Sequence, residues 1–551
     1  MNIVSGIVLT ILRIVIPFVC VWLTLSLYRT VFKRKRLPVI ATLAMQNNPA
    51  QYDIISCENF IGRGKLCDIR LNFTSVSRRH ALLSYDDKDG FKITALSNSE
   101  IFINGILVEE WGYIDHGDVI TIGGINLVFV VTDVNDLLED TKTTIARGTL
   151  KQTVLLTVFQ ALSFIEILVT QAPDIHFAVP IAFVLLIICE WVCFIAKGFK
   201  GNLQIEIIGF LLTGIGIGIC ATAAPDELLK LTFCAGVGII GYLVSGLILT
   251  RPSIIPGLQI IAMVFAGVLL LYNIIMGEYI NGARNWIMIG SFSFQPSEII
   301  KFVLIFVGGT TLVQMMNKKN FLIFIGFACF CIGALFLMRD FGTASIYFIT
   351  MLIIIYMRQG SVIPILATVG VAIVGIIVII SVMPYVLNRF SAYRHVWELA
   401  SSSGYQQTRT LIAIASGGLF GVGADEGNLQ YVAAADTDLV FGIVCEEWGM
   451  IVAFCAISLF LLLAIYAFKR AGKTTSAFYA ITACAAAGMF LFQISLNIFG
   501  STDILPLTGV TIPFISNGGS SMIASWLILS FIKACGKQVV PYVEEAKRGN
   551  K

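Results

Sequence analysis

The sequence contains few charged residues for its length. Asp, Glu, Lys and Arg make up 13% of the 551 residues, whereas hydrophobic residues make up 57%, and the mean hydropathy is +0.87. This composition excludes an ordinary soluble protein and is typical of a chain that crosses a membrane several times. The net charge of +3 is too small to indicate binding to nucleic acid.

The sequence also lacks the spacings of a disulfide framework or a zinc site. Nearly all of the 13 cysteines lie within apolar runs, where they resemble small buried hydrophobic residues. The four histidines are scattered along the chain, and no Cys/His spacing indicates zinc binding. The sequence shows no cofactor-binding motif and assigns no metal site. A divalent cation that assists catalysis is an open alternative.

What the sequence does contain is apolar runs long enough to cross a membrane. The first, Ile3 to Tyr28, precedes the basic cluster 33–36, which predicts a membrane anchor over 1–36 with its N-terminus outside. Twelve further runs follow, at about 150–171, 177–196, 203–222, 228–249, 256–276, 298–316, 320–337, 341–357, 361–384, 438–467, 477–499 and 516–534. The sequence therefore predicts a polytopic α-helical membrane protein of about 13 spans, with residues 537–551 as a basic cytoplasmic tail.

The loops between these runs predict the orientation. The predicted cytoplasmic loops carry basic residues, among them Lys197, Arg251 and Arg358, as expected for the inner side of a membrane. This pattern holds only if the chain turns at Arg339-Asp340, which places Asp340 near the outer surface. Two long outer segments, about 277–297 and 385–437, are then the predicted functional loops.

Residues 50–135 have a different pattern, with short alternating runs separated by turn residues such as Asn104-Gly105. They predict an all-β sandwich inserted on the cytoplasmic side. Its motifs resemble a forkhead-associated (FHA) domain, and they are Gly62-Arg63, Asp68-Ile-Arg-Leu71, Val76-Ser-Arg-Arg-His-Ala81 and Asn104-Gly105.

FHA domains bind phosphothreonine peptides. The resemblance implies that Arg63, Ser77 and Arg78 contact the phosphate, and that His80 is structural. Ser99 stands where the family usually has an asparagine that holds the peptide backbone, and Glu100 adds a negative charge there. The alternative is an inert spacer in which Arg63 and Ser77 only stabilise loops. Thr141, Thr143 and Thr144 follow the domain and are candidate phosphorylation sites.

Four further segments resemble the SEDS family (shape, elongation, division and sporulation), which includes the RodA, FtsW and SpoVE proteins. They are Asn281-Gly-Ala-Arg-Asn-Trp286 with Phe294-Gln-Pro-Ser-Glu298 and Lys301; Arg339-Asp-Phe-Gly-Thr343; Gly404-Tyr-Gln406 with Ser416-Gly-Gly418 and Gly421-Val-Gly423; and Asp438 with Glu446-Glu447, Leu505-Pro506, Pro513-Phe-Ile-Ser516 and Gly518-Gly-Ser-Ser521. The resemblance covers about 203–536 and leaves 150–197 as an extra pair of helices.

The resemblance implies a peptidoglycan glycosyltransferase that polymerises lipid II at the outer face of the bacterial plasma membrane. It also implies a class B penicillin-binding protein as partner, and Asp340 as catalytic residue. Glycosyl transfer needs a base for the acceptor hydroxyl and a cation, such as Arg284, Arg394 or Arg409, for the leaving diphosphate. The alternative for Asp340 is a cap of the helix that begins near Phe341.

The remaining residues of the predicted site come from the same motifs. Arg339 stands where the family usually has proline. For Asp438, a structural role and a functional role are equally favoured. Gln493 and Asn497 are expected to form hydrogen bonds between helices. The predicted substrate-binding or supporting residues are Arg284, Trp286, Gln295, Glu298, Lys301, Arg339, Thr343, Tyr405, Gln406, Asp438, Glu446, Ser516 and Ser520.

Two other functions remain open at this point. A lipid II flippase should carry polar groups along a transmembrane path, whereas the charged motifs here gather at one predicted surface. An idle scaffold would recruit phosphoproteins, or a Ser/Thr kinase, and a transpeptidase. The sequence does not distinguish a role in elongation, division or sporulation.

Overall fold

The computed structural model describes residues 3–537, with gaps at 33–40, 47–48, 55–57, 65–66, 87–89, 97–99, 132–134, 198–202, 252–254, 281–282, 291, 314–317, 360–365, 367, 371–392, 473 and 475. The chain divides into two compact units. One is helical and is formed by residues 1–32 and 148–539, and the other is a β unit within residues 33–147. Ser99, the cluster 33–36, the predicted span 361–384 and most of the tail lie outside the described residues.

The β unit is a sandwich of two sheets. One sheet has the strand order β2-β1-β11-β10-β7-β8 and the other has the order β4-β3-β5-β6-β9. Its strands are β1 (Ala41–Met45), β2 (Gln51–Ile54), β3 (Glu58–Gly62), β4 (Ile69–Arg70), β5 (Ala81–Asp86), β6 (Gly90–Ala95), β7 (Ile101–Ile103), β8 (Ile106–Val108), β9 (Trp111–Ile114), β10 (Val119–Ile122) and β11 (Ile125–Val131). Alternate residues such as Leu43, Ile93 and Phe129 fill one apolar core.

The predicted turn of this unit is present. Asn104 and Gly105 join β7 to β8 with φ angles of 51° and 81°. Two-residue hairpins of this kind need positive φ at both central positions, which Asn and Gly adopt most readily. The all-β prediction is therefore confirmed.

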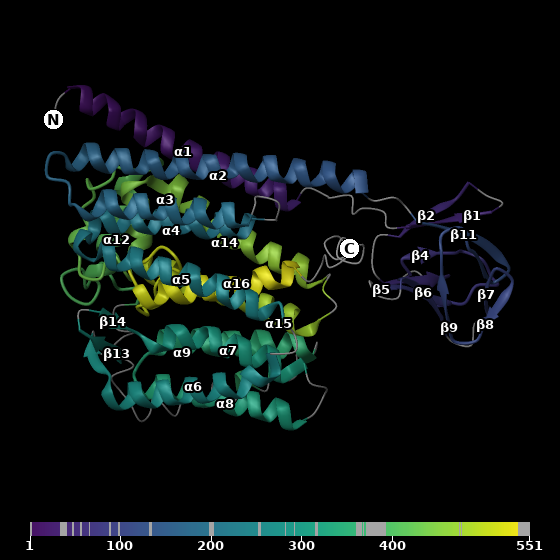
Figure 1. The fold of residues 1–551 in the computed structure, drawn as a ribbon. Coiled ribbons are helices and arrows are strands. Elements are labelled where there is room, and N and C mark those ends of the chain that lie inside the picture. The colour runs from purple at the N-terminus through teal and green to yellow at the C-terminus, as the bar shows by residue number, and fades with distance from the viewer. Residues whose placement is uncertain are drawn as a thin grey trace. The chain divides into compact units, whose positions relative to one another are not determined.

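The helical unit contains long apolar helices that run roughly parallel to one another (Figure 1). They are α1 (Ile3–Phe32), α2 (Asn135–Gln171), α3 (Ala178–Ala196), α4 (Gln204–Ala223), α5 (Leu228–Leu249), α6 (Ile255–Met276), α7 (Pro296–Val313), α8 (Lys318–Leu337), α9 (Phe341–Gln359), α14 (Gly449–Ala471), α15 (Ala477–Ser501) and α16 (Gly519–Lys537). In the described part of the chain, eleven helices are long and apolar enough to span a membrane. The remaining long helix, α7, carries Glu298 and Lys301, and together these helices correspond to every predicted run except 361–384.

One predicted run is not a single helix. The run 438–467 is divided at Trp448 into the short α13 (Val440–Glu447) and α14. Gly449 has a φ of 82° there, and its backbone touches Leu419 and Gly421, so the chain must bend to let the outer segment approach. Hydropathy alone does not register such a bend.

The two long segments predicted as loops contain regular structure at one end of the helical unit. Residues 278–294 form the three-stranded sheet β12 (Glu278–Ile280), β13 (Ala283–Ile289) and β14 (Phe292–Phe294). Residues 405–417 form α12 (Tyr405–Gly417). Figure 1 shows α12, β13 and β14 at the same end of the helical unit as the N-terminus of α1. This end is called the cavity end below.

Candidate active site

The chain reverses direction between α8 and α9, as predicted, through a residue in the left-handed conformation. Arg339 has a φ of 62°, and the N–H of Asp340 donates to the carbonyl of Leu335 at 2.9 Å. The N–H of Thr343 then donates to Asp340 Oδ1 at 3.0 Å. Asp340 therefore caps α9, and this contact also fixes the direction of its side chain.

The second oxygen of Asp340 is held by two amide side chains. Asn285 Nδ2 donates to Oδ2 at 2.9 Å, and Gln295 Nε2 donates to the same atom at 3.1 Å. Asn285 lies on β13, and Gln295 lies between β14 and α7. Three N–H donors from three segments thus hold a carboxylate that is 9% exposed.

Asp340 lies in the wall of a cavity of about 680 Å³ at the cavity end. Seven of the predicted site residues line it: Trp286, Gln295, Arg339, Asp340, Gln406, Asp438 and Ser520. Other lining residues, Asn285, Tyr393, Thr437 and Asn517, were not predicted as site residues. Asn285 follows Arg284 directly in the sequence, so a search of that motif for amides would have found it. Nothing in the sequence marks Thr437 or Asn517.

Asp438 is the second carboxylate of this cavity. It lies just before α13, next to Gly509, whose own lack of a side chain leaves room for the carboxylate. The pKa of Asp438 is raised to about 6, chiefly by desolvation; a hydrogen bond from Thr437 lowers it, and the carboxylates of Asp436 and Asp340 contribute to the rise. A carboxyl with a pKa near neutrality can accept a proton during a reaction.

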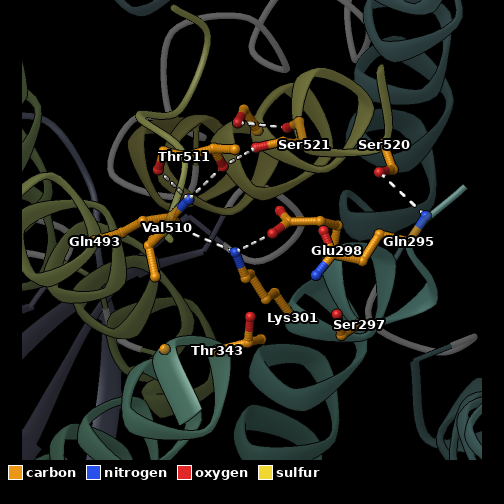
Figure 2. A network of polar contacts seen from close by, with 12 residues as sticks. Gln295, Ser297, Glu298, Lys301, Thr343, Gln493, Val510, Thr511, Ser520 and Ser521 are labelled. Atoms are coloured by element: carbon orange, nitrogen blue, oxygen red, sulfur yellow. Dashed lines mark hydrogen bonds and ion pairs between the residues drawn. The ribbon is translucent and has the colours of Figure 1, made fainter. Parts of the chain in front are cut away.

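The cavity wall is supported from below by a buried ion pair (Figure 2). Lys301 Nζ lies 2.7 Å from Glu298 Oε1 and donates to Gln493 Oε1 at 3.1 Å. Gln493 Nε2 donates to the carbonyl of Thr511 at 2.9 Å, and the Thr511 hydroxyl bonds to Ser521. Thr511 and Ser521 line the cavity, whereas Glu298 and Lys301 do not. The pair predicted as a site support therefore acts through α15 and the segment before α16.

Three more predicted residues support the site without lining it. Ser516 donates to the carbonyl of Thr437 at 2.7 Å, directly before Asp438. The carboxylate of Glu446 accepts the N–H groups of Asn428 and Leu429 at 3.0 and 2.9 Å, which marks it as structural. Thr343 contributes its backbone N–H to Asp340, as described above.

The structure does not place Arg284, Tyr405, Arg394 or Arg409 in the described cavity lining. Arg284 instead donates to the carbonyls of Gly277 and Ile275, both at 2.8 Å, so it fixes the end of α6 to β13. The Arg409 guanidinium lies 5.1 Å from the centre of the Tyr405 ring. Among the described lining residues, Arg339 is the one that carries a positive charge.

In the part of the chain that the structure describes, no group of three or more His, Cys, Asp or Glu side chains is arranged to hold a metal ion.

The β unit presents the predicted phosphate-binding residues on neighbouring loops. The N–H of Arg63 donates to the Ser77 carbonyl at 2.9 Å, which joins the loop after β3 to the loop before β5. Arg63 and Arg78 are exposed, and Ser77 is half-buried. His80 is buried and accepts the Ser77 N–H at Nδ1, while its Nε2 lies 3.1 Å from the Glu100 carbonyl. This arrangement brings the exposed guanidinium groups of Arg63 and Arg78 to the same pair of loops as the Ser77 hydroxyl.

Comparisons with known proteins agree with both units. The family model described as "Cell cycle protein", which covers FtsW, RodA and SpoVE, matches residues 227–538, and the FHA domain model matches residues 59–123. A probable peptidoglycan glycosyltransferase FtsW of Coxiella burnetii is 33% identical over 269 residues, which cover 47% of this chain and 72% of the relative. Stage V sporulation protein E of Bacillus subtilis is 28% identical over 254 residues, covering 45% of this chain and 69% of the relative.

A solved structure shares the fold of the helical unit. It belongs to a study of polymerization and crosslinking by a peptidoglycan synthase complex, has a TM-score of 0.52 and 23% identity, and is matched over 62% of this chain and 99% of its own. The chain is therefore a multi-pass membrane protein with an added FHA domain. It belongs to the FtsW, RodA and SpoVE family.

Proposed function

We propose that this protein is a peptidoglycan glycosyltransferase that polymerises lipid II at the outer face of the plasma membrane. The observation that carries the proposal is a single cavity that contains two carboxylates and one cation, Asp340, Asp438 and Arg339. Its relatives bear the name of this activity. The orientation inferred from the basic loops, with the cavity end outside and the β unit in the cytoplasm, agrees with an acceptor strand that grows outside the cell.

The reaction needs one proton acceptor. The base removes the proton of the acceptor 4-hydroxyl, the oxygen attacks C1 of the donor sugar, and the bond from C1 to the diphosphate oxygen breaks. The diphosphate leaves with the bonding electron pair, and Arg339 offsets its charge. The base ends the step as a neutral carboxylic acid.

The contacts favour Asp438 over Asp340 as this base, although the sequence alone pointed to Asp340. The Asp340 oxygens already accept three N–H bonds and cap a helix. Asp438 is half-buried and its pKa is raised to about 6, so it holds and releases a proton near neutral pH. In this proposal Asp340 orients Asn285 and Gln295 in the cavity wall.

The proposal includes two protein partners. A class B penicillin-binding protein would crosslink the strands, and a phosphothreonine-containing protein would bind to Arg63, Ser77 and Arg78. No cofactor is assigned, and a divalent cation beside the leaving diphosphate remains a component to be varied in the assay.

The test is polymerisation of purified lipid II by the full chain with a candidate transpeptidase, with and without divalent cations. Asp438→Asn should lose at least about a hundredfold in rate, since a general base contributes roughly 10²- to 10⁴-fold. Asp340→Asn should keep measurable activity. The reverse order would restore Asp340 as the base, and a wild type that makes no polymer while moving lipid II across vesicles would support the flippase.

A further inference from the structure

Helices α1 and α2 lie outside the residues that the family model matches, yet both contact the segment that leads to Asp438. This segment, Gly421 to Gly427, is called the hinge segment here. None of its residues is among the described residues that line the cavity. Its contacts with α1 and α2 are polar, which is unusual for helices that face a bilayer.

Arg13 of α1 contacts the hinge segment directly. Its guanidinium lies against Gly423, so closely that a side chain at position 423 would overlap it. Gly423 has a φ of +112°, a conformation that suits glycine. One turn and a half further along α1, the ring of Phe18 lies 6.3 Å from the ring of Phe420.

Glu166 of α2 contacts the next residue of the same segment. Its Oε1 accepts the N–H of Ala424 at 3.4 Å, and its side chain is 2% exposed. Arg13 lies near enough to interact electrostatically with Glu166. The two helices therefore present an arginine and a glutamate to adjacent backbone positions of the hinge segment.

The hinge segment is joined in turn to the helix that follows Asp438. The N–H groups of Val422 and Gly423 donate to the carbonyls of Glu446 and Glu447 at 2.8 and 3.0 Å. These two glutamates end α13, which begins two residues after Asp438. A displacement of the hinge segment would thus be passed along one short helix to the carboxylate.

Packing alone does not account for the charges. A buried arginine in a membrane helix is costly, and apolar residues would attach α1 to α14 at lower cost. Arg13 Nε is buried without a hydrogen-bond partner among the described residues, so the side chain is not optimised for stability.

We propose that Arg13 and Glu166 are positioning residues of the glycosyltransferase, which set the place of Asp438 through the hinge segment and α13. This inference rests on the proposed function. It assigns a role in the reaction to helices that lie outside the matched family region.

The test compares Arg13→Met with Arg13→Lys and with Arg29→Met, an exposed arginine of the same helix, in the full chain with its transpeptidase. We expect Arg13→Met to lower kcat between about tenfold and about a hundredfold, since small displacements of a catalytic group have effects of this size. The KM for lipid II should stay within about twofold because Arg13 does not line the cavity. Arg13→Lys should restore most of the rate, and Arg29→Met should match the wild type.

A kcat for Arg13→Met within twofold of the wild type, or a loss that Arg29→Met reproduces, would overturn the inference. If Arg13→Met fails to fold, as judged by its melting temperature, Glu166→Gln tests the same contact, because it keeps an oxygen for Ala424 and removes the charge. A Glu166→Gln enzyme with unchanged kcat would then overturn it. An inactive wild type would instead refute the proposed function itself.

Discussion

At the scale of single residues, the two carboxylates of the cavity differ in what their charge does for stability. Asp438 is half-buried and desolvation raises its pKa, so its ionised form is disfavoured in the folded protein. We expect Asp438→Asn to raise the melting temperature at pH 7.5. Asp340→Asn should lower the melting temperature. It should reduce the free energy of unfolding by about 1–3 kcal/mol, because the new amide nitrogen would face the N–H donors that now bind the carboxylate. Thermal melts of the full chain in detergent measure both.

Substitution of Asp436 gives the matched control for these melts, because it lies beside Asp438 and its carboxylate is bound by the Asn517 amide at 2.8 Å. Asp436→Asn should be neutral or destabilising. If Asp438→Asn were as destabilising as Asp340→Asn, the carboxylate of Asp438 would have to be held by donors that the structure does not show.

The pKa of Asp438 also fixes the sign of the pH dependence. With a pKa of about 6 the base form is lost as pH falls through 6, so the polymerisation rate should fall about tenfold per pH unit below that value. Because the folded pKa exceeds that of the unfolded chain, this group stabilises the fold most at low pH, and that contribution is lost as pH rises through 6. The neighbouring groups Thr437, Asp436 and Asp340 modulate the midpoint.

A pH–rate profile between pH 4.5 and 8, taken at saturating lipid II, measures this dependence. A rate that stays level down to pH 5 would argue against Asp438 as the base. The rate of Asp340→Asn should fall at acidic pH as that of the wild type does. The pKa of this fall should be slightly lower in the variant, because one negatively charged neighbour of Asp438 is gone.

At the scale of elements, the ion pair of α7 connects three helices to the cavity wall. Lys301→Met leaves Glu298 buried without its partner and should cost about 3–5 kcal/mol. The double variant Glu298→Gln/Lys301→Met should cost less than Lys301→Met alone, since it leaves no unpaired charge. Chemical unfolding of Glu298→Gln, Lys301→Met and the double variant, compared with the wild type, gives a double-mutant cycle. Strictly additive costs of the two single substitutions would contradict this account.

The loops of the β unit separate binding from stability. Arg63→Ala and Ser77→Ala should each abolish binding of a phosphothreonine peptide, and Arg63→Ala should do so with little change in unfolding because its side chain is exposed. His80→Ala should lower the free energy of unfolding of the domain, since the buried His80 ring bonds the backbone at Ser77 and at Glu100. Calorimetric titration of the full chain measures the first effect. Arg70→Ala, an exposed arginine of β4, serves as the control.

The elements of this protein were predictable where one physical property determines them. Hydropathy alone gives the long helices, and the Asn104-Gly105 turn gives the hairpin. Hydropathy does not predict α12 or the strands β12 to β14, because these elements are short, half-buried and stabilised by the helical unit beneath them. The bend at Trp448 depends on Gly449 touching Leu419 from a distant segment, and no local pattern contains that contact.

The candidate site was predicted in the same uneven way. Motif resemblance brought Asp340, Gln295 and Asp438 to one cavity, as the structure has them. It assigned Arg284 to a diphosphate although its guanidinium binds backbone carbonyls, because charge alone does not say where a side chain points. The contact of Arg13 with Gly423 joins residues that are 410 positions apart, so sequence motifs could not predict it.

At the scale of the whole molecule, the order of the elements suggests why α1 and α2 carry charges. The β unit is inserted between the end of α1 at Phe32 and the start of α2 at Asn135. Both helices reach the hinge segment at their other ends, through Arg13 and Glu166. A ligand of the β unit that favours one arrangement of α1 and α2 would therefore act on Asp438, as any coupling between two sites requires.

This reasoning predicts that a phosphothreonine ligand changes the rate of polymerisation. The probe is a synthetic peptide of residues 138–147, LEDTKTTIAR, phosphorylated at Thr141, added to the full chain with its transpeptidase. At saturation it should change kcat by about fivefold, a coupling of about 1 kcal/mol. Arg63→Ala should abolish the response by abolishing binding, whereas Arg13→Met should bind the peptide normally and respond weakly. A peptide that binds with unchanged kcat would show that the β unit recruits a partner without acting on the cavity.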